Sequence, residues 1–130
     1  GVPEFVKKWA DANKGGPIPV PGNVSYNGYM ATQELFRAIE RAGSTNNIAI
    51  IKALEGHKMS AKDRMQHFDA YTDTHQVQQT IYLARKNEKP VDNTDHFEIL
   101  SWAEPKDVAD DAAPGKCKLI PHDKVPSVDA

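Results

Sequence analysis

The chain has 130 residues, of which 39% are hydrophobic and 26% are charged, a composition typical of one ordinary globular domain. Its formal net charge of −2 gives no electrostatic reason to expect nucleic acid or an anionic membrane as a partner. No apolar run approaches the roughly 20 residues that a membrane-spanning helix needs. The chain begins at Gly1, which indicates a processed, engineered or proteolytic start.

Residues 1–22 predict one helix followed by a stiff connector. An apolar stripe at helical spacing, which includes Trp9, indicates an amphipathic helix over residues 3–13. Gly15 and Gly16 are expected to end this helix. The alternating prolines of PIPVPGN fix φ and keep the preceding residues extended, so an extended connector is expected there.

Residues 29–42 predict a second helix, and Gly43 is suited to the left-handed conformation at its end. Charged residues of this helix, Glu34 among them, are expected to face water. The side chains that are expected to be buried are Thr32, Leu35, Phe36, Ile39 and Ala42.

A third helix is expected directly after the second. Thr45 or Asn46 can cap it, and Gly56 can close it. Two helices so closely joined form a helical hairpin or corner.

The second half of the chain predicts a β-hairpin and a tail. Residues 59–74 carry a poor signal, whereas residues 77–85 and 96–102 read as two strands that pair across a long loop. Trp102 lies in the second strand and is expected in the core. Residues 104–130 contain four prolines and no apolar period, so we expect an extended tail that can lie along a surface.

These elements do not complete a fold. Two strands and three helices leave sheet edges and apolar helix faces uncovered, since a stable sheet needs further strands or full cover by helices. We therefore expect that a second polypeptide or an intertwined oligomer supplies what is missing, and that a compact monomer with its own multi-stranded sheet would contradict this. The single Cys117 is a free or buried thiol, or pairs outside this chain.

The sequence contains no recognisable catalytic or metal-binding motif. Its five histidines lie in no ligand spacing such as H-E-x-x-H, and structural roles are favoured for all of them. His67 and Asp69 could share a face of a strand and act in acid–base chemistry, but no nucleophile motif accompanies them. We expect a protein that is not an enzyme and has no cofactor or metal.

The start of the second helix is unusual, because Tyr26 and Tyr29 flank an Asn-Gly pair. The tyrosines can pack over the helix start as a hydrophobic staple. Alternatively, Tyr26 and Asn27 bind a ligand, since a Tyr ring and an Asn amide supply a flat apolar wall and a directed polar group. We expect Tyr26→Ala to weaken binding with little loss of stability, and Tyr29 to be core.

Several segments together resemble one known family. They are Phe5 with Trp9, Tyr26 with Tyr29, AIERAGS at 38–44, ALEG at 53–56 and DTHQVQQTIYLARKN at 73–87. In this order they are similar to the C-terminal part of the periplasmic binding proteins for branched-chain amino acids and related amides, which serve ABC transporters. Thr74, between Asp73 and His75, departs from the D-H-Q element of that family.

The resemblance implies an α/β fold of the type I periplasmic binding protein class, with ligand held between two lobes that three crossing segments join. Residues 1–22 would be the C-terminal helix of the second lobe with its connector, and residues 23–28 a hinge crossing. Residues 29–103 would return to the first lobe, and the tail at 104–130 lies beyond the resemblance.

The function implied is that of an extracytoplasmic solute-binding protein of an ABC importer, periplasmic or extracellular. Its partners would be a small amino acid, amide or carboxylate, the transporter's permease, and the remaining N-terminal part of the protein or another copy of the chain. A ligand-sensing regulatory or receptor domain of the same fold is the alternative.

Overall fold

The computed structural model describes residues 1–72, 75–92, 94–108 and 119–129. Its elements are helix α1 (Val2–Ala12), helix α2 (Asn23–Ala42), helix α3 (Asn47–Leu54), strands β1 (Lys58–Met59), β2 (Ala70–Thr72), β3 (Val77–Gln78), β4 (Ile81–Lys86) and β5 (Phe97–Ala103), helix α4 (Pro105–Val108) and the 3-10 helix η1 (His122–Lys124). The fold is α/β, with two small antiparallel sheets in the orders β1-β2-β3 and β4-β5.

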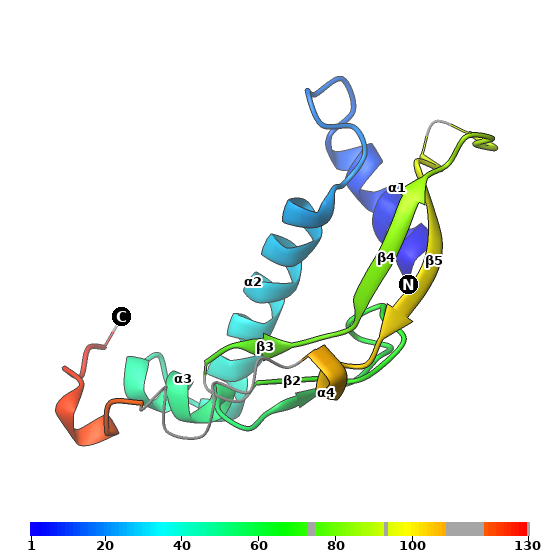
Figure 1. Ribbon diagram of the computed structural model, residues 1–130. Coiled ribbons are helices and arrows are strands. Elements are labelled where there is room, and N and C mark those ends of the chain that lie inside the picture. Colours follow the sequence, from blue (N-terminus) through cyan, green and yellow to red (C-terminus); the bar gives the residue numbers. More distant parts are fainter. Residues whose placement is uncertain (73–74, 93, 109–118, 130) are drawn as a thin grey trace.

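The arrangement is elongated, and the long helix α2 runs through the middle of it (Figure 1). The β4–β5 hairpin and α1 lie toward one end of the molecule, and α3 and the C-terminal segment lie at the other. The three-stranded sheet lies beside the second half of α2, and α3 packs against α2. No helix in the described part of the chain combines the length and the apolar character that a membrane crossing requires.

The predicted ends of the helices are largely confirmed. Gly43 is left-handed, with φ of 60°, and ends α2. Asn46 caps α3, because its side-chain oxygen accepts hydrogen bonds from the backbone N–H groups of Ile48 and Ala49 at 3.0 and 3.2 Å. Of the two caps that the sequence left open, Asn46 is therefore the one used.

The predicted start of α2 was wrong by six residues. The helix begins at Asn23 rather than Tyr29, and the extended Gly22 precedes it without a side-chain cap. Asn27 donates to the Asn23 side chain one turn earlier, at 2.9 Å. The Asn-Gly pair that indicated a turn therefore lies inside a helix, and residues 23–28 are its first turns. The role of these residues as a hinge crossing stays a prediction.

The buried face of α2 also differs from the predicted stripe. Its buried residues are Met30, Glu34 and Ala38, each one turn after the last. Phe36 is 61% exposed and Leu35 is 43% exposed, whereas Glu34, which was expected to face water, is 7% exposed. The reason is that Glu34 is paired: its carboxylate accepts a hydrogen bond from Arg41 at 2.7 Å and lies 3.4 Å from His57. A buried charge with such partners is stable in an interior.

The predicted hairpin is confirmed, with one correction. β4 and β5 pair antiparallel, with an irregularity in the register between Leu83 and Ala84. The single strand expected over residues 77–85 is two strands, because β3 ends at Gln78 and pairs with β2 in the other sheet. Trp102 was expected in the core, but it is 49% exposed. Trp9, on the apolar stripe of the first helix, is half-buried and donates to the Ile18 carbonyl at 2.9 Å.

The segment expected to be an extended tail at 104–130 contains two short helices in its described part, α4 and η1, and its last residues lie on α3. The backbone N–H of Asn47 donates to the Val128 carbonyl at 3.0 Å, and the Val128 N–H donates back to the Asn47 side chain at 2.8 Å. The preceding turn η1 brings His122 to 3.0 Å from Glu55. Cys117 and Thr74 lie outside the described residues.

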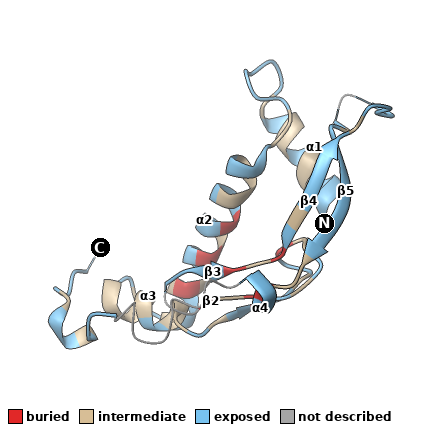
Figure 2. Cartoon of the chain, in the orientation of Figure 1, coloured by how far each residue is buried: buried red, intermediate tan, exposed pale blue. Residues whose placement is uncertain are grey.

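Much apolar surface is left uncovered, as predicted. The buried hydrophobic side chains of the described residues are Met30, Ala38, Met59 and Ala70, and no residue of β4 or β5 is buried. Figure 2 shows the buried positions on α2 and around the three-stranded sheet, and an exposed hairpin. That a second polypeptide or another copy covers these faces stays a prediction.

Candidate functional site

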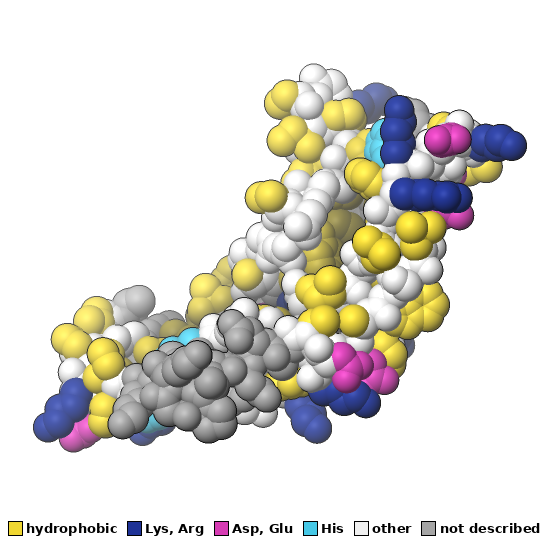
Figure 3. Space-filling model, in the orientation of Figure 1, with side chains coloured by type: hydrophobic (Ala, Val, Ile, Leu, Met, Phe, Trp, Pro, Cys, Tyr) yellow, Lys and Arg dark blue, Asp and Glu magenta, His cyan; other side chains and the backbone are white. Residues whose placement is uncertain are grey.

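A cavity of about 800 Å³ lies between the first turns of α2 and the base of the hairpin, and we refer to it as the α2 cavity. The molecular surface is hollowed between these elements (Figure 3). Its lining residues are Val2, Asn23, Tyr26, Asn27, Met65, Gln66, His67, Gln79, Thr80, Ile81, Tyr82 and Ile99. A cavity of this size, with apolar walls and a few polar groups, suits a small organic ligand.

Tyr26 is both a wall of the α2 cavity and part of a polar network beneath it. Its hydroxyl donates to the Arg64 carbonyl at 2.5 Å and accepts from the Gln66 amide at 2.9 Å. Its ring meets Phe5 edge-on, with the centroids 6.3 Å apart. Burial raises the pKa of the Tyr26 phenol, and the nearby Arg64 charge only partly offsets this rise. Tyr26 is therefore neutral at physiological pH.

This environment changes the expectation for Tyr26→Ala. The substitution would remove two hydrogen bonds and a ring contact, so a loss of stability is now expected together with any loss of binding. Tyr29 does not line the α2 cavity. Its ring lies 5.0 Å from the Phe5 ring, and the residue is 46% exposed, so it is only partly the core residue expected.

Asn27 lines the same cavity as Tyr26, so the structure brings the two predicted residues together. Its amide N–H donates to Asn23, which also lines the cavity, and this contact holds the Asn27 side chain along the helix. The side-chain oxygen of Asn27 is an acceptor that this contact does not use.

Arg64 lies behind the cavity wall and is the charged residue that sequence reasoning missed. It is 5% exposed, and it forms no ion pair with any described residue. One terminal N–H₂ donates to the Gln79 side-chain oxygen at 2.5 Å, and the Nε–H has no hydrogen-bond partner in the described part of the chain. Its guanidinium carbon lies 5.9 Å from the centre of the Tyr26 ring. No motif surrounds this residue in the sequence, so only its burial marks it.

Gln79 connects Arg64 to the α2 cavity. Its side-chain oxygen accepts from Arg64 and, at 3.3 Å, from Gln66. Because a guanidinium can only donate, the Gln79 oxygen must face it, which fixes the orientation of the amide. The amide N–H₂ of Gln79 has no partner among the described residues, and Gln79 lines the cavity.

The predicted acid–base pair of His67 and Asp69 does not form. The residues precede β2 rather than lying on a strand. The His67 imidazole contacts the Tyr82 hydroxyl at 3.2 Å and stacks on Trp102, with the ring centres 4.0 Å apart. Asp69 instead accepts from the Ala61 backbone N–H at 2.7 Å. His67 thereby fastens the hairpin to the rest of the molecule.

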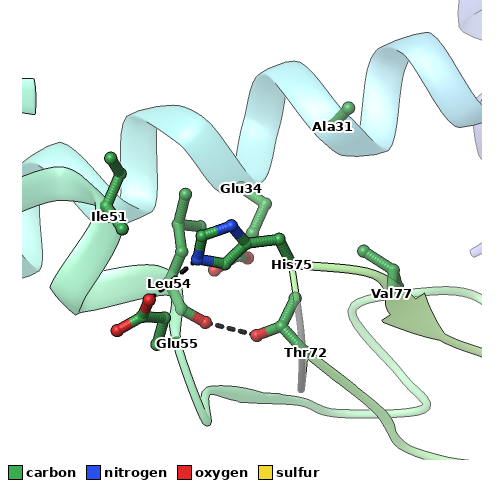
Figure 4. A pocket seen from close by; sticks show the side chains of 8 residues that line it. All are labelled: Ala31, Glu34, Ile51, Leu54, Glu55, Thr72, His75 and Val77. Atoms are coloured by element: carbon green, nitrogen blue, oxygen red, sulfur yellow. Dashed lines mark hydrogen bonds and ion pairs between the residues drawn. The ribbon is translucent and has the colours of Figure 1, made fainter. Parts of the chain in front are cut away.

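A second cavity of about 290 Å³ lies between α2, α3 and β3, and Figure 4 shows its side chains. Its polar groups contact one another: His75 contacts Glu55 at 2.8 Å, and the Thr72 hydroxyl donates to the Leu54 carbonyl. Its remaining surface is mostly apolar, so it offers fewer free polar groups than the α2 cavity. No cluster of His, Cys, Asp and Glu within the described ranges is suited to hold a metal ion.

Comparison with known proteins identifies the family. The sequence profile described as "Periplasmic binding protein" matches residues 2–90, which is more than half of the chain. Searches of curated proteins and of solved structures gave no match. Proteins of this family bind solutes, are typically not enzymes and act outside the cytoplasm. The matched range contains the elements that form the α2 cavity, except β5. Because the profile matches more than half of the chain, the chain belongs to the periplasmic binding protein family.

Proposed function

We propose that this chain is part of an extracytoplasmic solute-binding protein of an ABC importer, periplasmic or extracellular. Its ligand is a small amino acid, amide or carboxylate that binds between two lobes, and this chain supplies one wall of the site. The observation that carries the proposal is the α2 cavity, and the match to a solute-binding family supports it. Its mixture of aromatic, aliphatic and amide side chains is typical of small-molecule sites.

Within this site we assign ligand contacts to Tyr26 and Asn27. The Tyr26 ring offers an apolar face, and the free oxygen of Asn27 accepts a hydrogen bond from an amine or amide. Both lie in the first two turns of α2, close to the positive end of the helix dipole, which favours a negative group.

The test is isothermal titration calorimetry of the protein against a panel of amino acids, their amides and short carboxylates. Asn27→Ala is the informative variant, since among the described residues the Asn27 side chain bonds only Asn23, so its removal should disturb little of the fold. We expect the affinity for the bound solute to fall about tenfold, the equivalent of about 1.4 kcal/mol. Tyr29→Ala is the matched control, because Tyr29 lies in the same helix outside the cavity lining. Unaltered affinity in Asn27→Ala would remove the residue from the site.

The partner in transport would be the permease of the ABC importer. Neighbouring genes distinguish this from the alternative of a ligand-sensing domain. An adjacent permease gene supports transport, whereas fusion to a signalling domain in the same gene product supports sensing.

A further inference from the structure

We infer that Arg64 gives the α2 cavity a preference for a carboxylate group over a neutral isostere, and that it acts through Gln79. The inference rests on the proposed solute-binding function and narrows its ligand class. Arg64 would be a positioning residue, because its own nitrogen atoms lie behind the wall rather than in the cavity.

The first step is the charge of Arg64. A buried guanidinium is costly unless an anion or several acceptors compensate it. Arg64 is 5% exposed, and its Nε–H has no partner among the described residues. Within the same residues, its terminal nitrogens contact the Gln79 oxygen and, at 4.0 Å, the Met59 sulfur. No described carboxylate pairs with it. Arg64 is thus a buried cation to which the described part of the chain supplies no counter-charge.

The second step is the composition of the cavity wall. None of the described residues that line the α2 cavity is an aspartate, glutamate, lysine or arginine. The uncompensated charge that acts on a ligand there is consequently that of Arg64. Its field favours an anion, and an interior of low dielectric constant screens it less than water would.

The third step is the fixed amide of Gln79. Since its oxygen is occupied by Arg64 and Gln66, Gln79 can offer the ligand only N–H donors. A carboxylate needs donors, and hydrogen bonds to an ionised acceptor are the stronger kind. Arg64 therefore contributes twice, by its charge and by the direction in which it holds the amide.

The test compares pairs of probes that share a shape and differ in charge: benzoate against benzamide, and pentanoate against pentanamide. Each is titrated calorimetrically into the protein at neutral pH. We expect the carboxylates to bind about tenfold more tightly than their amides, in line with the greater strength of charge-assisted hydrogen bonds. In Arg64→Gln this ratio should fall to near one, and in Arg64→Lys, which keeps the charge, much of it should return.

Arg37→Gln is the matched control. Arg37 lies 3.7 Å from Asp63, the neighbour of Arg64, but its side chain is 36% exposed. Removing this charge changes the net charge of the protein as Arg64→Gln does, yet water screens it from the cavity. The carboxylate-to-amide ratio should therefore stay at the unmodified value.

Gln79→Glu separates a role in selectivity from a role in folding, and it serves also if Arg64→Gln does not fold. The new carboxylate would pair with Arg64, so the melting temperature should rise while the preference for carboxylate probes disappears. A rise in stability with an unaltered preference would overturn the inference.

Other outcomes are equally decisive. Equal binding of carboxylates and amides, or a preference that survives Arg64→Gln, overturns the inference and leaves the proposed function standing if any solute of the panel binds. Binding of none of the amino acids, amides and carboxylates overturns both.

Discussion

Apolar side chains are buried in one region of the molecule and exposed in another. Around α2 and the three-stranded sheet, a few side chains such as Met30 and Met59 are almost fully buried. In the β4–β5 hairpin, Leu83 is 60% exposed and Phe97 is 67% exposed, although these strands are as apolar in sequence. The first region is stabilised by side-chain packing, whereas the hairpin is held by its backbone ladder and a few contacts at its base. An isolated two-stranded hairpin is marginally stable at best. The apolar pattern therefore predicted the strands of the hairpin, whose side chains are exposed, and missed β1 and β2 of the sheet beside the buried side chains.

The largest expected change in the free energy of unfolding comes from a test of this comparison that substitutes one apolar side chain in each region. Met59→Ala should lower the free energy of unfolding by about 2–4 kcal/mol, because it removes buried groups and leaves a cavity. Leu83→Ala, at an exposed site, should change it by about 0.5 kcal/mol or less. Chemical denaturation followed by circular dichroism measures both. Equal losses would show that the hairpin faces are covered in solution.

A second pair of variants compares ion pairs. The Glu34 side chain is 9% exposed and lies 2.7 Å from Arg41, so Glu34→Gln should cost about 1–3 kcal/mol of unfolding free energy. In the hairpin, Arg85 and Glu98 lie at a similar distance of 2.8 Å, but their side chains are 64% and 50% exposed. Glu98→Gln should therefore cost about 0.5 kcal/mol or less, as exposed pairs usually do. A larger loss in Glu98→Gln than in Glu34→Gln would reverse the comparison.

A third variant weakens the connection between the regions. The Tyr82 hydroxyl accepts from the His67 backbone N–H at 3.0 Å, so Tyr82→Phe should cost about 0.5–1.5 kcal/mol. Hydrogen exchange of β4 and β5 amides should accelerate more than exchange in α2. Tyr71→Phe is the control, since no described residue bonds its hydroxyl. Uniform acceleration across the chain would mean that the hairpin does not open separately.

The smallest expected effect depends on pH. The hydrogen bond with His75 lowers the pKa of Glu55 below its ordinary value of 4.5, with a further contribution from His122. A depressed carboxyl pKa stabilises the fold above the unfolded-state pKa, and this contribution is lost as pH falls through the folded-state pKa. Near neutral pH, Glu55→Gln should thus lower the free energy of unfolding by less than about 1 kcal/mol, with a slightly lower melting temperature. The difference from the unmodified protein should vanish in acid.

Asp92, in the loop of the hairpin, provides the counterpart to Glu55. Hydrogen bonds from Thr94 lower its pKa, and the group is fully exposed. Asp92→Asn should show the same sign and the same loss of effect in acid, measured by thermal denaturation. A Glu55 difference that grows in acid would contradict the assignment of its partners.

The elements that sequence predicted well are those with local causes. Gly43 and Asn46 mark helix ends through their own backbone preferences, so no knowledge of the rest of the fold is needed. The start of α2 was missed because Asn27 and Gly28 prefer turns in isolation, and tertiary contacts of Tyr26 and Met30 outweigh a preference of about 1 kcal/mol.

The site was accessible to sequence reasoning only in part. Tyr26 and Asn27 stood out by their unusual place before a helix, and both line the α2 cavity. Arg64 and Gln79 did not stand out, because their hydrogen bond joins positions 15 apart, with β2 and β3 between them, and depends on burial that no local pattern encodes. The buried face of α2 was missed for a similar reason, since Glu34 became a core residue through Arg41 and His57.

The early start of α2 has a mechanical consequence. A helix of 20 residues without an internal proline is a rigid rod about 30 Å long. Tyr26 lies near one end of this rod, and the other end leads through Gly43 to α3 and the docked residues 126–129. A tilt of about 5° at the cavity end displaces the far end by about 2–3 Å over that length. A spectroscopic label at Ser127 would therefore report any such tilt of α2 as a measurable displacement, although Ser127 does not line the cavity.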